Sequence, residues 1–225
     1  LAVAGCAIRE NRLGRRLRRE DLLAELREAD AVIAGVEPYD EAVLAALPRL
    51  RCISRCGVGT DAVDLEAARR RGIAVYTTAD EVVEPAAQLT VAMILALARN
   101  LPLHLDAFRA GRWQKRTGVL LSEWTIGLVG FGRIGRLVAR YLHPFGPRLL
   151  VADPALPAGP QADGVTAAEL DTLLAESDLV SVHAARPREA GVLLGRRELG
   201  LMKRGGYLVN TDRGYLVDEA ALEEA

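Results

Sequence analysis

The sequence Thr125-Ile-Gly-Leu-Val-Gly-Phe-Gly-Arg-Ile-Gly-Arg-Leu-Val-Ala139 decides the fold that we predict. Its first five residues form a short apolar run typical of a buried strand, and apolar residues at helical spacing follow the last glycine. A strand, a glycine turn and a helix are the context in which G-x-G-x-x-G binds a dinucleotide. In that context Gly130 permits the tight turn, Gly132 lets the pyrophosphate approach the backbone, and Gly135 lets the helix pack close to the strand.

The next predicted strand supports this interpretation. It covers residues 148–153 and ends at Asp153, 18 residues after Gly135. A carboxylate at this strand end can accept hydrogen bonds from the ribose hydroxyls and repels a 2′-phosphate, so it favours NAD over NADP. The alternative is a glycine-rich turn in an ordinary α/β domain, with Asp153 in solvent. The combination of context, spacing and acid disfavours that alternative.

The composition limits the classes of function that we consider. The chain has 225 residues, half of them hydrophobic, with 29 basic and 30 acidic side chains. This is enough for one or two domains with substantial cores. Only Lys115 and Lys203 are lysines, so 27 of the 29 basic residues are arginine, which with the many alanines indicates a coding bias. A DNA-binding domain needs an uncompensated basic face. The basic run at 15–19 is followed by acidic residues and is interpreted as a solvated helix entry, so no nucleic-acid partner is expected.

The cysteines and the apolar stretches favour a cytoplasmic protein without a metal site. Cys6, Cys52 and Cys56 are odd in number and form no C-x-x-C motif, so we interpret them as reduced core residues. The three histidines show no ligand spacing with them. Residues 1–30 lack the apolar region of a signal peptide. The longest apolar stretch, 86–98, is too short to span a bilayer, so no membrane partner is expected.

Strand and helix signals alternate along the whole chain. The predicted strands cover residues 1–8, 31–34, 50–54, 73–76, 125–129, 148–153, 177–183 and 207–210. The predicted helices cover residues 21–29, 39–47, 65–71, 86–99, 167–175 and 196–202, with Thr166 and Glu169 as a capping box and a last helix opening at 217. This β-α rhythm predicts an α/β fold with parallel sheets covered by helices.

The recurrence of this pattern predicts two Rossmann-like or flavodoxin-like domains, residues 1–98 and 99–225. The chain begins at Leu1 and stops inside a helical pattern, so we expect an excerpt of a longer product with an incomplete second domain. Residues 86–99 are apolar on nearly every side, which predicts a helix buried all round between the two domains. Residues 101–115 form either a second crossing helix or part of a subunit contact.

The strand ends that follow the fingerprint predict one cleft. In an open α/β sheet, ligands bind at the carboxyl ends of the strands. We therefore expect Asp153, residues 183–184 and residues 211–213 to line a cleft together with residues 130–135. The alternative for each of these side chains is a strand-end position in solvent.

Several motifs together carry a family resemblance. They are Arg55-x-Gly57-x-Gly59-x-Asp61-x-x-Asp64-Leu65, then Gly-Phe-Gly-Arg-Ile-Gly with Asp153, then Val182-His183, Leu199-x-x-Met202-Lys203-x-Gly205, and Leu208-Val-Asn-Thr-x-Arg213-Gly-x-x-Val-Asp-Glu-x-Ala-Leu222. In this order and spacing the chain resembles the D-isomer-specific 2-hydroxyacid dehydrogenases, most of all their 3-phosphoglycerate dehydrogenase branch. The resemblance runs from about residue 22 to the end.

The resemblance implies a split substrate domain, an inserted Rossmann domain that binds NAD, and usually a homodimer. It implies oxidation or reduction of a small 2-hydroxy or 2-oxo acid, with 3-phosphoglycerate as one candidate. Arg213 matches the catalytic arginine, which holds the substrate carboxylate and polarises the 2-oxo group. The remaining matches are Val58 and Gly59 at the substrate carboxylate (Val58 also near the cofactor), Arg55 at a second substrate anion, Arg133 and Ile134 over the pyrophosphate, Asp153 at the ribose, and Ala184, Thr211, Asp212 and Arg213 beside the nicotinamide.

Departures from the family pattern keep a second interpretation open. The family's general acid is a histidine tuned by a glutamate, and both come after the arginine motif, beyond the residues present. Asp212 replaces a small residue and could pair with Arg213, which would weaken anion binding. Gln88 stands where a glutamate is usual, and His183 is interpreted as a support of the cleft. The alternative function is a non-catalytic NAD-binding relative, such as a sensor or co-repressor-like protein.

Overall fold

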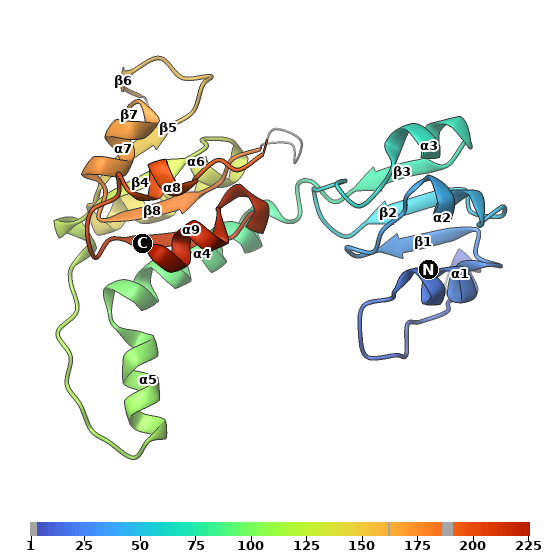
Figure 1. Cartoon of the computed structure of the whole chain (residues 1–225), viewed down its shortest axis with the longest axis horizontal. Coiled ribbons are helices and arrows are strands. Elements are labelled where there is room, and N and C mark those ends of the chain that lie inside the picture. The colour runs from blue at the N-terminus through green and yellow to red at the C-terminus, as the bar shows by residue number, and fades with distance from the viewer. Residues whose placement is uncertain (1–3, 162, 186–190) are drawn as a thin grey trace. The chain divides into compact units, whose positions relative to one another are not determined.

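The chain folds into two compact units, Leu1–Val82 and Val83–Ala225. The computed structural model describes residues 4–161, 163–185 and 191–225. Each unit is an α/β structure built on a mostly parallel sheet, which confirms the predicted fold class (Figure 1).

The units divide at the beginning of helix α4 (Val83–Ala98), whereas the predicted domain boundary lies at its end. The reason is that α4 packs along helix α6 (Arg133–Leu142) within the second unit. Its residues Ala87, Ile94 and Ala98 are buried in the core of that unit.

In its described residues, the first unit has a three-stranded parallel sheet in the strand order β1-β2-β3, with three helices. In chain order its elements are α1 (Arg19–Leu26), β1 (Ala31–Ala34), α2 (Glu41–Ala45), β2 (Cys52–Arg55), α3 (Leu65–Arg70) and β3 (Ala74–Thr77). Asp40 and Asp64 cap α2 and α3, because their carboxylates accept hydrogen bonds from the backbone N–H groups of Val43 and Ala67. Each such cap stabilises its helix by about 1 kcal/mol.

One face of this sheet is packed and the other is bare. Ile53 of β2 is fully buried with Leu22 of α1 and Val43 of α2. On the opposite face, Ile33 of β1 is 66% exposed and Tyr76 of β3 is 62% exposed. Parallel sheets are normally covered on both faces. The described residues of the first unit therefore leave this face without a cover.

The sequence predictions fail in two places within the first unit. Residues 4–8 form no strand: they are exposed, and Gly5 lies in a turn with a φ of +76°, so no packing stabilises an extended chain there. Residues 1–3 lie outside the described residues. All three cysteines are free thiols as expected, but Cys6 and Cys56 are exposed rather than in the core.

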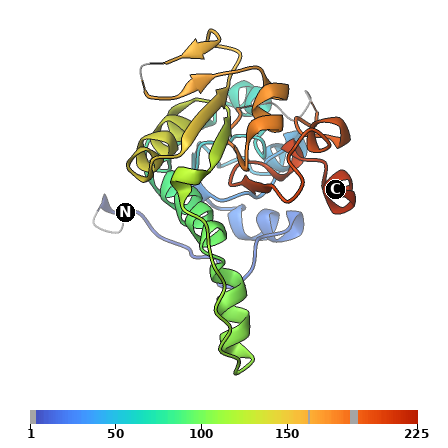
Figure 2. The same cartoon turned by 90° about the vertical axis from the view of Figure 1, so that its left-hand side faces the viewer.

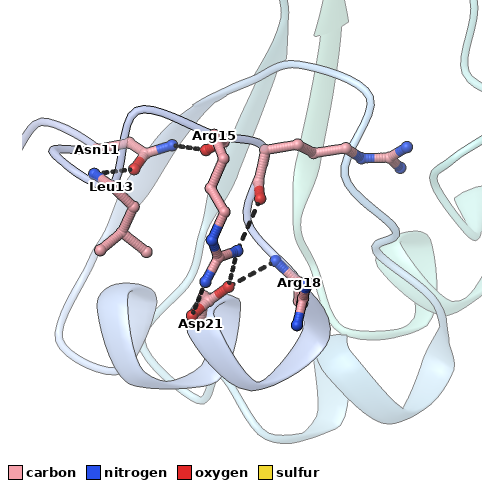
Figure 3. A network of polar contacts seen from close by, with 6 residues as sticks. Asn11, Leu13, Arg15, Arg18 and Asp21 are labelled. Carbon is pink, nitrogen blue, oxygen red and sulfur yellow. Dashed lines mark hydrogen bonds and ion pairs between the residues drawn. The ribbon is translucent and has the colours of Figure 1, made fainter.

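The segment before α1 is held by a polar network (Figure 3). The Arg15 guanidinium donates two hydrogen bonds to the Asp21 carboxylate, at 2.6 and 3.1 Å, and the backbone N–H of Arg18 donates to the same group at 2.8 Å. The Asn11 side chain bonds to the carbonyl of Arg15 and to the N–H of Leu13. The basic run is thus a solvated helix entry, as predicted.

The second unit is a six-stranded sheet in the order β6-β7-β5-β4-β8-β9, parallel except for β6. Its strands are β4 (Thr125–Val129), β5 (Arg148–Ala152), β6 (Gly159–Pro160), β7 (Thr166–Ala167), β8 (Leu179–Val182) and β9 (Tyr207–Asn210). Its helices are α4, α5 (Leu101–Arg109), α6, α7 (Leu170–Glu176), α8 (Arg196–Leu199) and α9 (Glu219–Glu224), with short 3-10 turns η2 (Leu121–Glu123), η3 (His143–Phe145) and η5 (Gly214–Leu216).

Both faces of this second sheet are covered. Ile126 and Leu128 of β4 lie in a buried cluster with α4 and α6, whereas Val180 and Val182 of β8 lie in a cluster with α7 and α8. This double burial explains why the strands are continuous apolar runs in the sequence. The parallel strands β4, β5, β8 and β9 therefore bring their carboxyl ends to one edge of the sheet.

Helix α7 begins at Leu170 rather than at residue 167. Thr166 and Ala167 instead pair with Leu150 and Val151 of β5, so the predicted capping box does not form. Two-residue strands carry no periodic signal, and the helix prediction therefore extended into β7.

Helices α4 and α5 both expose apolar side chains. Leu89 and Met93 of α4 are 56% and 40% exposed, so the second unit by itself does not bury this helix on every side. Helix α5 projects from the second unit, and the chain returns alongside it in both views (Figures 1 and 2). Among the described residues no single helix is long and apolar enough to cross a membrane; α4 and α5 meet that test only as a pair bent by 68°.

Candidate dinucleotide-binding site

The three glycines of the fingerprint have three different surroundings. A Cβ on Gly130, whose φ is +95°, would lie 2.4 Å from the carbonyl oxygen of His183. A Cβ on Gly135 would lie 2.4 Å from the carbonyl oxygen of Gly130. A Cβ on Gly132 would meet nothing within 4 Å. Gly130 and Gly135 thus allow close packing of the backbone, and Gly132 leaves open space beside the turn, as the fingerprint predicts.

The open space lies at the N-terminus of α6. Gly132 is the N-cap residue of this helix and provides no side-chain cap. The first N–H groups of a helix have no partner within the helix, and the dipole adds positive potential there. This helix end can therefore bind a pyrophosphate through backbone N–H groups. Arg133 and Ile134 form the first turn of α6, where the sequence placed them over the pyrophosphate.

A cavity of about 650 Å³ lies beside this turn, at the carboxyl edge of the sheet. It is lined by Val129, Gly130, Gly132, Ala152, Asp153, Pro154, Leu156, Ala158, Ala167, Ala168, Glu169, Leu170, His183, Ala184, Ala185 and Leu193. Its size and mixed lining are typical of cofactor sites. It brings together the fingerprint, Asp153 and residues 183–184, as predicted, whereas residues 211–213 do not line it.

Asp153 is held in place by two backbone groups. Its Oδ2 atom accepts a hydrogen bond from the N–H of Phe131 at 2.7 Å, and its Oδ1 atom accepts one from the N–H of Ala155 at 2.9 Å. The carboxylate is thus fixed at the end of β5 beside the glycine turn, and a 2′-phosphate near it would meet a negative charge.

His183 is a partly buried, neutral support of the cavity wall. Its backbone N–H donates to the carbonyl of Val129 at 2.7 Å, and its Nε2 atom is 2.9 Å from Ser181 Oγ. Burial lowers the pKa of this imidazole from about 6.5 to about 4. At neutral pH the side chain therefore carries no charge and acts as a packing and hydrogen-bonding group.

Arg213 follows β9 in a loop that its neighbours hold from both sides. The Asn210 side chain donates from Nδ2 to the carbonyl of Arg213 at 2.9 Å and accepts at Oδ1 from the N–H of Asp212 at 3.0 Å. The Arg213 Nη1 atom lies 3.4 Å from Asp212 Oδ1, with 37% and 27% of the two side chains exposed. The predicted pairing of Asp212 with the arginine is thus present.

The first unit contains the predicted anion loop after β2. Arg55 is only 6% exposed. Its Nε atom donates to the carbonyl of Gly59 at 2.8 Å, and its Nη1 atom donates to the carbonyls of Ala34 and Gly35. The guanidinium thus organises its own loop, and among the described residues no group accepts a hydrogen bond from its Nη2 atom. The sequence placed Arg55 at a substrate anion but gave no sign of this internal role.

The backbone of the same loop presents donors. The N–H of Gly57 donates to Thr78 Oγ1 at 2.8 Å, and its carbonyl accepts from the N–H of Thr78 at 3.2 Å. Within the described residues no group accepts a hydrogen bond from the N–H of Val58 or of Gly59. These two N–H groups are available to an anion; their binding of a substrate carboxylate, which the family resemblance implies, stays a prediction.

The apolar part of the cavity was not predicted. Leu156 and Ala158 come from the β5–β6 connection, Leu170 from α7 and Leu193 from the loop before α8. Lone apolar residues in loops give no signal in the sequence. The described residues contain no cluster of three His, Cys, Asp or Glu side chains placed to hold a metal ion.

The glycine turn, the open helix N-terminus and the strand-end carboxylate define the second unit as a dinucleotide-binding domain of the Rossmann type. Comparison with known proteins refines this class. Residues 91–225 match the family described as D-isomer specific 2-hydroxyacid dehydrogenase, NAD binding domain. The chain belongs to this family, and its second unit carries the family's NAD-binding domain.

Individual relatives agree with this assignment. The D-3-phosphoglycerate dehydrogenase of Mycobacterium tuberculosis is 38% identical over 211 residues, which cover 92% of this chain and 40% of that protein. The glyoxylate reductase of Thermococcus kodakarensis is 38% identical over 225 residues, covering 94% of this chain and 67% of that protein. The structure of D-lactate dehydrogenase from Aquifex aeolicus complexed with NAD and lactic acid has a TM-score of 0.79 at 33% identity, covering 90% of this chain and 62% of that one. The chain thus spans less than half of the phosphoglycerate dehydrogenases that it matches.

Proposed function

We propose that the protein containing this chain is an NAD-dependent oxidoreductase that interconverts a D-2-hydroxy acid and its 2-oxo acid. The observation that supports this most is Arg213, which the Asn210 side chain holds at the carboxyl edge of the sheet that binds the cofactor. A guanidinium is always charged and binds a carboxylate through two parallel hydrogen bonds, so it can orient the substrate and polarise the 2-oxo group.

The other residues of the site bind and orient the cofactor and the substrate. The N-terminus of α6 holds the pyrophosphate, Asp153 accepts from the ribose hydroxyls, and Ala184 lies beside the nicotinamide. The nicotinamide, when bound, supplies or accepts the hydride. The N–H groups of Val58 and Gly59, in the first unit, are proposed donors to a substrate carboxylate. Arg55 contributes its remaining donor, Nη2, to a second substrate anion such as a phosphate.

None of the residues named so far is assigned as the proton donor for the oxo oxygen. His183 is unsuited to that role, because burial lowers its pKa to about 4 and its ring is bonded to Ser181. A general acid works best with a pKa near the operating pH. We infer that the donor is supplied by a part of the full-length protein that follows Arg213, as the family resemblance implies.

The test is turnover by the full-length protein with NADH and three 2-oxo acids: glyoxylate, pyruvate and 3-phosphohydroxypyruvate. We expect reduction of at least one, and a fall of about 10³-fold or more in kcat/KM for Arg213→Ala, because an electrostatic group at the reacting carbonyl is lost. Binding of NADH without turnover of any 2-oxo acid would overturn this function. That result would instead favour the alternative, a non-catalytic NAD-binding protein, for which the Asp212–Arg213 pair is the supporting observation.

We also propose a homodimer that forms through α5, and a location in the cytoplasm. Leu101, Leu103, Leu105 and Phe108 of α5 are 45–76% exposed, and Trp113 is 95% exposed. Apolar surface of this kind is typical of protein interfaces. Free thiols suit a reducing compartment. We expect sedimentation of the full-length protein to give a dimer and the double variant Phe108→Ser/Trp113→Ser to give a monomer; a wild-type monomer would contradict the proposal.

A further inference from the structure

Thr90 is a buried polar residue in the middle of an apolar helix. It lies in α4, and its side chain is 0% exposed. Threonine in a helix interior commonly bonds back to the carbonyl four residues earlier, which slightly destabilises the helix. Valine has the same shape and no hydroxyl to bury. Stability of α4 therefore does not account for a hydroxyl at this position.

The hydroxyl of Thr90 has a second partner, 121 residues later in the sequence. Its Oγ1 atom donates to the carbonyl of Ala86 at 2.9 Å and lies 2.8 Å from Oγ1 of Thr211. A hydroxyl has one proton, and a carbonyl can only accept. Both bonds form at the same time only when Thr90 donates to Ala86 and the Thr211 hydroxyl donates to Thr90. The direction of this bond is thus fixed by the helix.

Thr211 is the first residue after β9 and lies two positions before Arg213. The Asn210 amide already bonds the backbone on both sides of the Asp212–Arg213 peptide bond. These bonds hold the loop against its own strand. The Thr90–Thr211 bond adds a tie to a different element, α4, which is packed in the core of the second unit. Two ties in different directions fix the position of a loop better than one.

We propose that Thr90 is a positioning residue of the Arg213 site. It acts through Thr211, and it fixes the loop 211–213 to α4 so that the guanidinium meets the substrate in one orientation. The restraint on the loop does not depend on the proposed function. The effect on turnover does, since it rests on Arg213 contacting the substrate.

The first test is amide hydrogen exchange of peptides covering residues 210–214 in the full-length protein. Loss of one hydrogen bond changes an opening equilibrium by about fivefold, so we expect Thr90→Val to exchange about fivefold faster there and Thr90→Ser to exchange like the wild type. The matched control is Ser177→Ala, because Ser177 is also 0% exposed and donates to the carbonyl four residues earlier, at 2.6 Å from Leu173. Equal exchange in Thr90→Val and the wild type, or the same change in the control, would overturn the proposal.

The second test is steady-state kinetics of the same variants. We expect kcat/KM of Thr90→Val to fall about 5- to 50-fold, because a small misplacement of an orienting group is costly, while the NADH dissociation constant stays within about twofold. Thr90→Ser restores kcat/KM, and Ser177→Ala keeps it. Wild-type protein that turns over no 2-oxo acid refutes the proposed function and leaves the exchange result to decide this inference. If Thr90→Val does not fold, Thr211→Val removes the same bond from the other end, and unchanged exchange in that variant overturns the inference.

Discussion

Gly135→Ala tests how closely α6 packs on the glycine turn. The new methyl group would lie 2.4 Å from the carbonyl oxygen of Gly130, a backbone atom that cannot rotate away. Overpacking of this kind costs about 1–3 kcal/mol, and the short distance favours the upper end. Alanine also has a higher helix propensity than glycine, which stabilises α6 by about 1 kcal/mol. The net loss is about 2 kcal/mol, which lowers the Tm of a domain of this size by about 4–8 °C.

Gly132→Ala is the matched control, because its methyl group would meet nothing within 4 Å. Loss of the glycine N-cap costs less than about 1 kcal/mol, so its Tm falls by less than about 3 °C. Its NADH affinity falls about tenfold, or about 1.4 kcal/mol, because the methyl group occupies space needed by the pyrophosphate. The assays are thermal unfolding by circular dichroism and titration of NADH fluorescence. A Gly135→Ala variant as stable as the wild type, or a Gly132→Ala variant with unchanged NADH affinity, would refute this account of the turn.

Three further predictions concern charged groups. Asp153→Ala raises NADPH affinity relative to NADH by about tenfold, because the repulsion between the Asp153 carboxylate and the 2′-phosphate is removed. Two unit charges 4 Å apart near a protein surface repel by about 4 kcal/mol, which solvent and salt reduce to about 1–2 kcal/mol. An unchanged affinity ratio in fluorescence titrations contradicts the role of Asp153. Asp212→Ala lowers KM for the 2-oxo acid about two- to fivefold, because Asp212 no longer competes with the substrate for Arg213. The Asp212–Arg213 ion pair, at 3.4 Å and partly exposed, contributes less than about 1 kcal/mol, which limits the effect. A higher KM in initial-rate kinetics would show that Asp212 assists binding instead. His183 has a pKa of about 4 when folded and about 6.5 when unfolded, so the unfolded state binds more protons between these values. Stability therefore falls by about 3 kcal/mol as the pH drops from 6.5 to 4; urea unfolding across this range should show the loss, and His183→Gln should remove it.

The sequence predicts the elements that have strong local signals. Residues 31–34 and 125–129 form strands with the predicted bounds, and the three glycines have the surroundings that the fingerprint requires. These features depend on short apolar runs and on residues close together in the chain. The position of Asp153 follows for the same reason, because it ends the strand next to β4.

The features that the sequence does not predict arise from contacts between distant residues. The tie between Thr90 and Thr211 joins residues 121 positions apart. The use of the Arg55 guanidinium by the carbonyls of Ala34, Gly35 and Gly59 depends on how β1 and β2 pair. An arginine in a loop motif predicts an anion-binding site. Only the fold shows that most of this side chain's N–H groups already donate to backbone carbonyls.

The bare face of the first sheet also has a consequence for the protein. Parallel sheets need a cover on both faces, and Ile33 and Tyr76 are more than 60% exposed. We expect the 225-residue chain to bind a hydrophobic dye more strongly than the full-length protein. Equal dye binding would mean that this face is also bare in the longer protein.

We propose that the cavity beside the glycine turn binds NAD and that Asp153 excludes a 2′-phosphate. The most direct measurement is calorimetric titration of this chain with NAD and with NADP under the same conditions. We predict binding of NAD and a dissociation constant for NADP about tenfold higher or more, through the repulsion at Asp153. Equal affinity for the two cofactors, or no binding of NAD, would contradict the account.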